Sequence, residues 1–487
     1  MLQSLRSTFA RLFSYSTLLT TLVVTLIFFF CKGRNLFVDP DIWWHLRDAE
    51  YLIRSHAFIH ADMYSFTVAG RPWINSEWLS ELPFYCAWRW FGPRGVLVLT
   101  ICLIESVALG VCWLGWQRTR NIKPALLACC LSLLMISVSI GPRTVFFGWL
   151  CLIVEIFLLQ EFREGRDRLW LLPPLFVVWI NLHGTWPIGI VYLFLFVGCG
   201  MFEASWGAIF AERWPPAQRT KLLWVAGLCV LALFLNPYGF RLVVFPFQML
   251  YGHKLMIASV EEWQTLDFHS VRGKFTFAMI ASLVFLNMVR RRAWRLNDLL
   301  FTCIAVLAAF TYSRLLVLAA LVVCPSIAAE LDFFEPYNGA QDKPLLNFAL
   351  IAFLVGTMLN RLPAQATLQQ QIAKGLPQAA AEYLHTAKLD GRVMNELSWG
   401  GYLEWSDRSV PAFIDSRSEI FDPWGVLQDY IDVIGIKRPL EVIDEYKIRY
   451  ALFPPNTSIV YLLTRTPGWS TVYQDDTAVV LHRERPY

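Results

Sequence analysis

The feature that most constrains this chain is a series of long apolar runs. Eleven of them approach the ~20 residues that a helix needs to cross a bilayer. They lie at 12–31, 94–116, 124–140, 144–161, 169–182, 186–203, 222–236, 274–289, 296–311, 315–330 and 344–361. Hydrophobic residues make up 56% of the 487 residues and charged residues only 16%, which excludes an ordinary soluble domain. The sequence therefore predicts a polytopic α-helical membrane protein with about eleven transmembrane helices.

Basic residues between these runs predict the orientation, because cytoplasmic loops retain Lys and Arg. They fall on alternate loops, as Arg6 and Arg11; Arg118, Arg120 and Lys123; Arg163, Arg166 and Arg168; Arg213, Arg219 and Lys221; and Arg290 to Arg292 with Arg295. The turn 330–343 is expected on the same side, although it is acidic apart from Lys343. The N-terminus is then cytoplasmic, and the loop 32–93 and the region from 363 are extracytoplasmic.

The first apolar run carries no small-residue cleavage site, so we interpret it as an uncleaved span rather than a signal peptide. A bacterial inner membrane is the expected location. The net charge of +4 is small and scattered over the loops, and no nucleic-acid partner is expected. All eleven cysteines lie at or before Cys324, without the spacing of a disulfide framework or a zinc site.

The region 363–487 differs in character from the membrane domain, 1–362. Short apolar segments predict buried strands at 410–414, 450–453, 470–473 and 478–482, and amphipathic patterns predict helices at 422–434 and 438–446. About 125 residues suffice for one small domain with its own core. The expected architecture is a transmembrane domain, a large first extracytoplasmic loop carrying interfacial helices, and a small extracytoplasmic α/β domain at the C-terminus.

The first loop carries two carboxylates two residues apart, Asp39 and Asp41, just past the first span. A carboxylate there can accept a proton from an attacking hydroxyl, and its neighbour can raise its pKa or help to bind a divalent cation such as Mg²⁺ or Mn²⁺. Asp41 also has a structural interpretation, as the N-cap of a helix lying in the membrane interface with its tryptophans in the lipid. Asp39 has no such duty in this interpretation and is the better candidate base.

Two further polar residues of the loop are candidates for substrate binding. His45 follows Asp41 by one helical turn and could face it, although it could equally be plain polar surface. Glu77 stands near the start of a second interfacial helix, with Asn75 as a plausible N-cap. The helix dipole alone favours an acid in that first turn, so a structural role for Glu77 is as reasonable as a functional one.

Polar, sharply turning segments that are not basic clusters all fall on the predicted outer side. They are the first loop, 141–143, 181–184, 236–239, 261–263 and 312–314. They bring Arg143, His183, Glu262 and Arg314 to one face. Outward arginines oppose the positive-inside bias, and guanidinium groups there could stabilise a phosphate leaving group. Headgroup anchoring or pairing with an acid would explain the two arginines equally well, and His183 could be a hydrogen-bonded histidine at a helix end.

At this point the residues resemble a known family. VDPDIWWHLRDAEYLI at 38–53 and DMYSFTVAGRPWINSEWLSE at 62–81 resemble the first external loop of bacterial polytopic proteins of the GT-C glycosyltransferase superfamily. That superfamily includes protein O-mannosyltransferases, aminoarabinose transferases of lipid A and oligosaccharyltransferase catalytic subunits. Further matches are GPR at 141–143, INLHG at 180–184, LNPYG at 235–239, EEW at 261–263, NELSWGGYLEW at 395–405 and AFIDSR at 412–417.

The resemblance implies transfer of a sugar, with inversion, from a polyprenyl-phosphate donor to an acceptor on the outer face. Asp39 best matches the acid that acts as base, with Asp41 as its partner, and in some members a metal bridges such acids and the donor phosphate. The acceptor, a protein, lipid or glycan, is not specified. Trp399 and Tyr402 belong to a stretch similar to the Trp-Trp-Asp-Tyr-Gly motif of oligosaccharyltransferases, but the motif's Asp is missing, so a sequon reader is not implied.

We expect Trp399, Tyr402 and Asp415 to help to hold an acceptor over the site. The alternative is structural, with Gly400 and Gly401 in a tight turn and Asp415 paired with Arg417. Two other functions remain open at this stage. Glu105 and Glu155 within predicted spans favour a transporter or flippase for a lipid-linked glycan, although no inverted repeat is evident. A relative that binds a glycolipid without catalysis would share the same acids.

Overall fold

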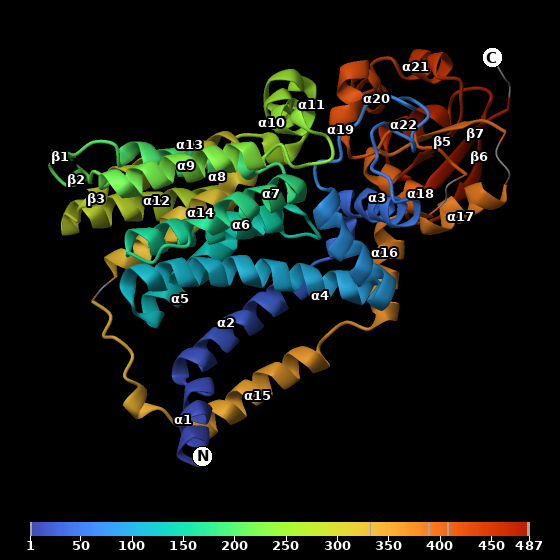
Figure 1. The fold of residues 1–487 in the computed structure, drawn as a ribbon. Helices are drawn as coiled ribbons and strands as arrows, with labels where there is room; N and C mark the ends of the chain where they lie inside the picture. Colours follow the sequence, from blue (N-terminus) through green and yellow to red (C-terminus); the bar gives the residue numbers. More distant parts are fainter. Residues whose placement is uncertain (1, 332, 388–389, 407–408, 485–487) are drawn as a thin grey trace.

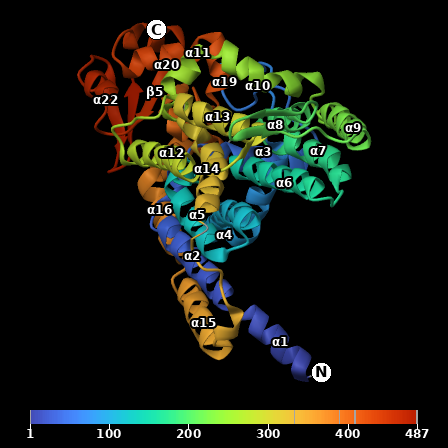
Figure 2. The ribbon, with the colours of Figure 1, turned by 90° about the vertical axis from the view of Figure 1, so that its left-hand side faces the viewer.

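The computed structural model describes residues 2–331, 333–387, 390–406 and 409–484, with side chains from residue 7 onward. The side chain of Arg6, part of the first predicted basic cluster, therefore lies outside the described residues. The chain forms a helical bundle that carries a mixed α/β domain at one end (Figure 1). A short α1 (Leu2–Leu12) precedes the bundle, and α2 and α15 extend from it on the side away from the C-terminal domain (Figure 2).

Each predicted apolar run forms a helix. These helices are α2 (Tyr15–Lys32), α4 (Trp78–Thr119), α5 (Ile122–Ile136), α6 (Val145–Arg163), α7 (Leu172–Leu182), α8 (Trp186–Cys199), α9 (Pro216–Ala232), α12 (Val271–Arg290), α13 (Leu296–Thr311), α14 (Leu316–Glu330) and α15 (Pro344–Asn360). Within the described residues, six helices are long and apolar enough to cross a membrane, or seven if the bent pair of α15 and α16 (Gln365–Gly375) is one span. The count of eleven spans therefore stays a prediction.

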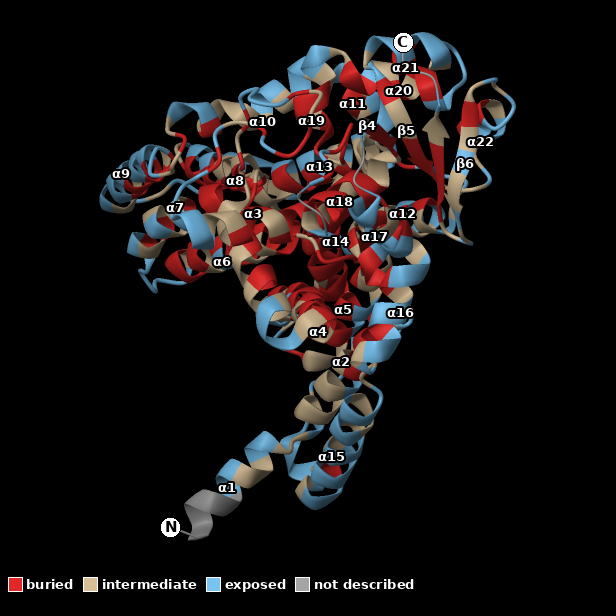
Figure 3. Cartoon of the chain, turned by 90° about the vertical axis from the view of Figure 1, so that its right-hand side faces the viewer, coloured by how far each residue is buried: buried red, intermediate tan, exposed pale blue. Residues whose placement is uncertain are grey.

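The helix α14 forms the centre of the bundle, because every residue from Leu316 to Ala328 is buried. It packs against α4, α5, α12 and α13, and Figure 3 shows buried residues gathered where α14, α5 and α4 meet. The outward faces of the surrounding helices expose large apolar side chains such as Phe285, Leu307 and Phe353. Exposed apolar faces of this extent match a lipid surround, and the chain is a membrane protein.

The long helix α4 bends at Gly92, whose φ of 58° lies in the left-handed region. Pro93 follows and supplies no backbone N–H, so the break leaves backbone groups without helical partners. Gln365, from the segment after α15, accepts a hydrogen bond from the Arg94 N–H at 3.2 Å and donates one to the Phe91 carbonyl. The part of α4 after the bend coincides with the predicted second span, and the part before it belongs to the first loop.

The C-terminal domain is built on a four-stranded sheet in the order β4, β5, β7, β6. The strands are β4 (Arg392–Asn395), β5 (Ile448–Phe453), β6 (Trp469–Gln474) and β7 (Val479–Arg483). Only the β4–β5 pair is parallel. The helices are α17 (Gln378–Thr386), α18 (Gly400–Ser406), α19 (Ser418–Phe421), α20 (Val426–Ile434), α21 (Pro439–Glu445) and α22 (Ser458–Leu463). Three of the four predicted strands are confirmed.

The fourth predicted strand, 410–414, is wrong, and β4 takes its place in the sheet. Ala412 instead makes an isolated bridge with Ser65 of the first loop. The Phe66 N–H donates to the Ala412 carbonyl at 3.1 Å, and the Thr67 hydroxyl donates to the Phe413 carbonyl at 2.6 Å. The first loop is thus paired with the C-terminal domain through the backbone.

The helix α3 (Asp41–Ser55) corrects a second expectation, because its tryptophans do not lie in a lipid interface. Trp43 is 1% exposed, and its ring contacts those of Trp88 and Tyr402 at 5.5 and 5.0 Å. The helix lies between α4 and α18. The apolar stripe that predicted an interfacial helix is therefore buried in protein.

Candidate functional site

Asp39 lies immediately before α3, with its side chain buried at the junction of three segments. One carboxylate oxygen accepts the Asp41 N–H at 3.2 Å, and the other accepts a hydrogen bond from Arg143 Nε at 2.7 Å. The N-cap position belongs to Pro40, and Asp41 is the first helical residue. We expected Asp41 to cap the helix and Asp39 to have no capping role. This expectation is wrong, because Asp39 accepts the Asp41 N–H and also faces Arg143.

Arg143 connects two acidic segments of the site. It lies just before α6, and besides Asp39 it forms an ion pair with Glu262 of the short 3₁₀ helix Glu261–Trp263. Burial disfavours the guanidinium charge, but Asp39 and Glu262 outweigh it and raise the pKa of Arg143. Arg314 lies close by, with its guanidinium 4.4 Å from the Trp263 ring centre. The guanidinium groups of Arg143 and Arg314 thus lie close to the carboxylates of Asp39 and Glu262.

Gly141 makes the approach of Asp39 to Arg143 possible. A Cβ atom at this position would lie 2.6 Å from Asp39 Oδ2, closer than real Cβ contacts allow. Its backbone is not in the left-handed region, so the glycine is required by the carboxylate and not by the turn. The predicted GPR segment therefore supplies a close contact as well as a cation.

Glu77 forms a second cluster of predicted residues together with His45 and His183, between which it lies. His183 Nδ1 accepts the Thr185 N–H at 3.1 Å, so its Nε2 carries the proton and donates to Glu77, 3.2 Å away. Burial lowers the pKa of His183 to about 4, and the ring is neutral at pH 7. Burial also opposes ionisation of Glu77, but His183, His45 and the Thr144 hydroxyl outweigh it and hold the pKa of Glu77 below its ordinary value.

His45 joins this cluster to buried polar groups that the sequence did not single out. Its Nε2 lies 3.6 Å from Glu77, and its Nδ1 lies 2.9 Å from Glu81. Asn75 donates to Glu81 at 2.9 Å and to Asp48 at 3.3 Å. Asn75 also accepts the Glu77 N–H at 3.0 Å, but Glu77 itself occupies the N-cap of α4, so the predicted cap is wrong. His45 is therefore fixed within a network and is not plain surface.

Asp41 faces the C-terminal domain. Burial, together with the nearby Asp39 carboxylate, raises the pKa of Asp41 to about 6 against the lowering effect of Arg143. The indole N–H of Trp44 lies 3.1 Å from the Ser416 hydroxyl and 3.4 Å from Asp41. Ser416 is thus the residue of the C-terminal domain that reaches the acids, although the sequence analysis did not select it.

The structure brings eight of the eleven predicted site residues together and places the other three apart. Trp399, Tyr402 and Asp415 are buried within the C-terminal domain and its contact with α3. The predicted tight turn at Gly400 and Gly401 is wrong, because both begin α18. A Cβ on Gly401 would lie 3.1 Å from the Pro40 carbonyl. This motif therefore docks α18 on the segment that carries Asp39.

Arg417 organises a buried ion cluster that joins the C-terminal domain to the first loop. It donates to Asp415 at 2.9 Å and to Asp62 of the first loop at 3.1 Å, and Glu404 lies 3.4 Å away. The predicted pair of Asp415 with Arg417 is confirmed. Burial raises the pKa of Glu404 well above its ordinary value, and the Asp415 carboxylate raises it further against the lowering effect of Arg417.

A cavity of about 540 Å³ lies between the first loop, α10 (Phe240–Gly252) and the C-terminal domain. Aromatic faces of Trp73, Tyr238 and Trp424 line it together with polar side chains. Glu419 also lines it, and burial raises the pKa of Glu419 to about 7, with a further contribution from Asp41. Aromatic faces beside hydrogen-bonding groups are features of a site for a polar organic ligand.

Asp39 and Asp41 are the residues that would hold a divalent cation. Among the described residues, no three His, Cys, Asp or Glu side chains converge in a metal-binding arrangement. Both acids interact with the Arg143 guanidinium. The protein alone therefore offers two carboxylates, and phosphate oxygens of a ligand would have to complete the shell of a hard cation.

Comparisons with known proteins bear on the fold. No protein-family model matches the chain, and a search of curated proteins finds no match. Among solved structures, the chain is similar to an oligosaccharyltransferase of Archaeoglobus fulgidus, solved with a tethered acceptor peptide that contains the NVT sequon. The TM-score is 0.52 at 12% identity, over 91% of this chain and 69% of that one. The chain therefore has a GT-C-type fold, as the resemblance of its first loop predicted.

Proposed function

We propose that the protein is a glycosyltransferase that moves a sugar from a polyprenyl-phosphate donor to an acceptor on the extracytoplasmic face of the bacterial inner membrane. The observation that carries the proposal is the ion pair of Asp39 with Arg143, with Glu262 on the same guanidinium and Arg314 beside it. This arrangement supplies one base and two phosphate-binding cations at the ends of apolar helices, where a lipid-linked donor presents its phosphate.

The chemistry follows from these groups. The donor phosphate competes with Asp39 and Glu262 for Arg143, because guanidinium binds phosphate oxygens in two-point contacts. Asp39, released from Arg143, accepts the proton of the acceptor hydroxyl as that oxygen attacks the anomeric carbon from the face opposite the phosphate. The bond from carbon to phosphate oxygen breaks, the polyprenyl phosphate leaves on Arg143 and Arg314, and the sugar is transferred with inversion.

The acceptor is proposed to enter through the 540 Å³ cavity, because Glu419, which lines this cavity, interacts electrostatically with Asp41. Asp41 orients the acceptor hydroxyl, and His45, Glu77 and His183 hold the floor of the site. Trp399, Tyr402 and Asp415 support the site from the C-terminal domain. A Mg²⁺ or Mn²⁺ ion on Asp39 and Asp41 would neutralise the donor phosphate.

The test is consumption of a panel of polyprenyl-phosphate sugars by the purified full-length chain in lipid. We expect one donor to turn over, and Asp39→Asn to lose at least about a hundredfold in rate, in the range expected for general base catalysis, while the donor still binds. Assays with Mg²⁺, with Mn²⁺ and with EDTA decide whether a cation takes part. Asp476→Asn, the same change at an exposed residue between β6 and β7, is the control and should match the wild type. Activity that survives Asp39→Asn refutes the assignment of the base.

A second function, transport of a lipid-linked glycan, is favoured by one observation. Glu155 lies in α6, fully buried, and neither of its oxygens has a hydrogen-bond partner among the residues that the structure describes. Intramembrane acids often mark ion pathways. If the protein transports its glycan, Glu155→Gln abolishes glycolipid movement across a vesicle membrane and Asp39→Asn does not. If it transfers a sugar, Asp39→Asn abolishes sugar transfer and Glu155→Gln does not. Donor binding with neither activity would leave a binding protein.

A further inference from the structure

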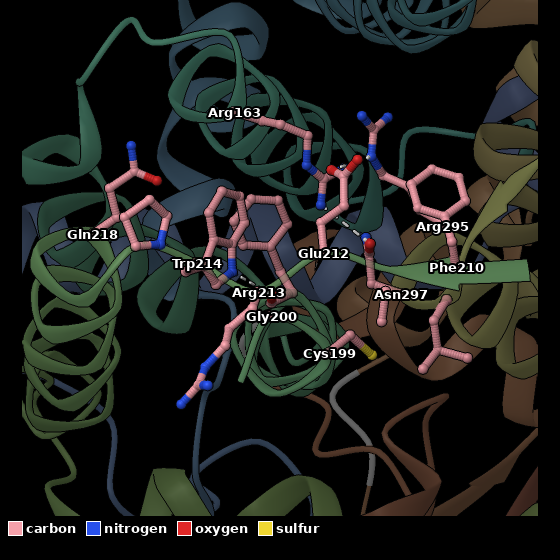
Figure 4. Close-up of a pocket in the computed structure, with 14 residues that line it drawn as sticks. Arg163, Cys199, Gly200, Phe210, Glu212, Arg213, Trp214, Gln218, Arg295 and Asn297 are labelled. Atoms are coloured by element: carbon pink, nitrogen blue, oxygen red, sulfur yellow. Dashed lines mark hydrogen bonds and ion pairs between the residues drawn. The ribbon is translucent and has the colours of Figure 1, made fainter. Parts of the chain in front are cut away.

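A second polar cavity has a volume of about 360 Å³ (Figure 4). It lies at the end of the bundle remote from α3 (Figure 1). It is enclosed by the ends of α6, α8 and α13 and by a small sheet of β1 (Ala204–Trp206), β2 (Ile209–Ala211) and β3 (Trp294–Arg295). The helix α6 joins the two sites, since Arg143 lies just before its first residue and Arg163 is its last. A helix of 19 residues is ~28 Å long, so one bilayer thickness separates them.

Arginines dominate the charge of this cavity. Arg163, Arg213 and Arg295 line it, with Glu212 as the single acid among the lining residues. Figure 4 shows the guanidinium groups of Arg163 and Arg295 near one another and near Glu212. Arg295 Nε is 3.8 Å from the Glu212 carboxylate and makes no hydrogen bond within the described part of the chain. The Glu212 side chain is 67% exposed, so this pair is weak and a stronger anion would displace it.

The cavity is held open by packed aromatic residues. The Arg163 guanidinium stacks on Phe196 at 4.6 Å and donates to Asn297 at 3.1 Å, which fixes its direction. Trp214 packs on Gly200 so closely that a Cβ there would lie 1.9 Å from the indole. The pairing of β2 with β3 places Arg295 beside Phe210. An apolar wall therefore stands beside two oriented guanidinium groups.

We propose that this cavity binds a phosphate group, carried by an anionic membrane lipid or by a soluble phosphate compound. Guanidinium groups match the geometry of phosphate oxygens, and basic pockets between membrane helices bind phospholipid headgroups. The aromatic wall of Phe196 and Trp214 gives the ligand an apolar contact next to its charge. The site is separate from the Asp39 site, and the proposal does not depend on the transfer reaction.

The test compares the full-length wild type with Arg163→Gln/Arg295→Gln by native mass spectrometry, with phosphatidylglycerol or phosphatidylcholine added to delipidated protein. The matched control is Arg166→Gln/Arg168→Gln, which removes the same charge from the same end of α6 but outside the cavity. A parallel arm measures whether inorganic phosphate raises the thermal midpoint. Arg295→Gln alone serves as a variant that leaves the Arg163 contacts intact, since the Arg295 side chain is 41% exposed.

We expect the wild type to retain one phosphatidylglycerol, and the cavity variant to bind it about a hundredfold more weakly, because two charged hydrogen-bond donors are lost. Arg295→Gln alone should lose about tenfold, and the control should match the wild type. Stabilisation by inorganic phosphate without lipid binding, again lost in the cavity variant, assigns the site to a soluble phosphate compound. The proposal is overturned if neither probe depends on Arg163 and Arg295, or if the control loses as much as the cavity variant.

Discussion

Replacing Gly141 by alanine tests the geometry of the site without removing any functional group. The added Cβ would lie 2.6 Å from Asp39 Oδ2, whereas ordinary contacts begin at 3.4 Å, so the carboxylate must retreat by about 0.8 Å. Arg143 Nε lies 3.5 Å from the added Cβ and 2.7 Å from Oδ2, nearly at a right angle to this retreat, so the bond to Arg143 lengthens only to ~2.9 Å and persists while the carboxylate is displaced. Misplacement by ~1 Å costs about a hundredfold in rate, or ~2.7 kcal/mol.

The assay is the rate of sugar transfer with the donor that the wild type consumes. We expect kcat/KM of Gly141→Ala to fall about a hundredfold while its thermal midpoint stays near that of the wild type. Gly184→Ala is the matched control, because a Cβ there meets nothing within 4 Å and its backbone is not left-handed. If Gly141→Ala keeps more than about half of the wild-type rate, the position of the Asp39 carboxylate does not limit the reaction.

Two further predictions concern stability. Arg417→Met leaves Asp62, Asp415 and Glu404 buried without their cation. It should lower the free energy of unfolding by ~3–5 kcal/mol, measured as a lower thermal midpoint. Equal midpoints for this variant and the exposed control Arg465→Met would contradict the prediction. The pKa of His183 falls from 6.5 in the unfolded chain to about 4, so the unfolded chain takes up a proton first as the pH falls from 6.5 to 4, and folding loses ~3 kcal/mol in that window. In His183→Gln this pH dependence of stability should disappear. The prediction is refuted if the thermal midpoints of the variant and the wild type fall in parallel as the pH is lowered.

Much of the membrane domain could be predicted, because each apolar run carries its own signal. All eleven runs became helices. The number of these helices that cross the membrane could not be decided, since α7, α8 and α13 are shorter than a bilayer requires. Convergence of the turning segments was also predictable, because alternate helix ends share a face. Thus Arg143, His183 and Glu262 could be assigned to one site from the sequence.

The environment of α3 could not be predicted, for a physical reason. Tryptophans on one face of a helix look the same whether that face meets lipid or another part of the protein, and here α4 and α18 bury Trp43. Glu81 and Asp48 were missed because each lies within a helical segment, where an isolated acid resembles surface. The strand β4 was missed because it has four residues and pairs with β5, a long way along the chain.

The ion cluster of Arg417 has a consequence for how the protein is made. Asp62 leaves the ribosome long before Arg417, since 355 positions separate them, and contacts so remote in sequence form slowly. Until residues 412–417 have been synthesised, the first loop lacks the guanidinium of Arg417 and the backbone partners at Ala412 and Phe413. A chain that ends before Ala412 therefore lacks the contacts that join the first loop to the C-terminal domain, and the arrangement described for the first loop is completed late in synthesis.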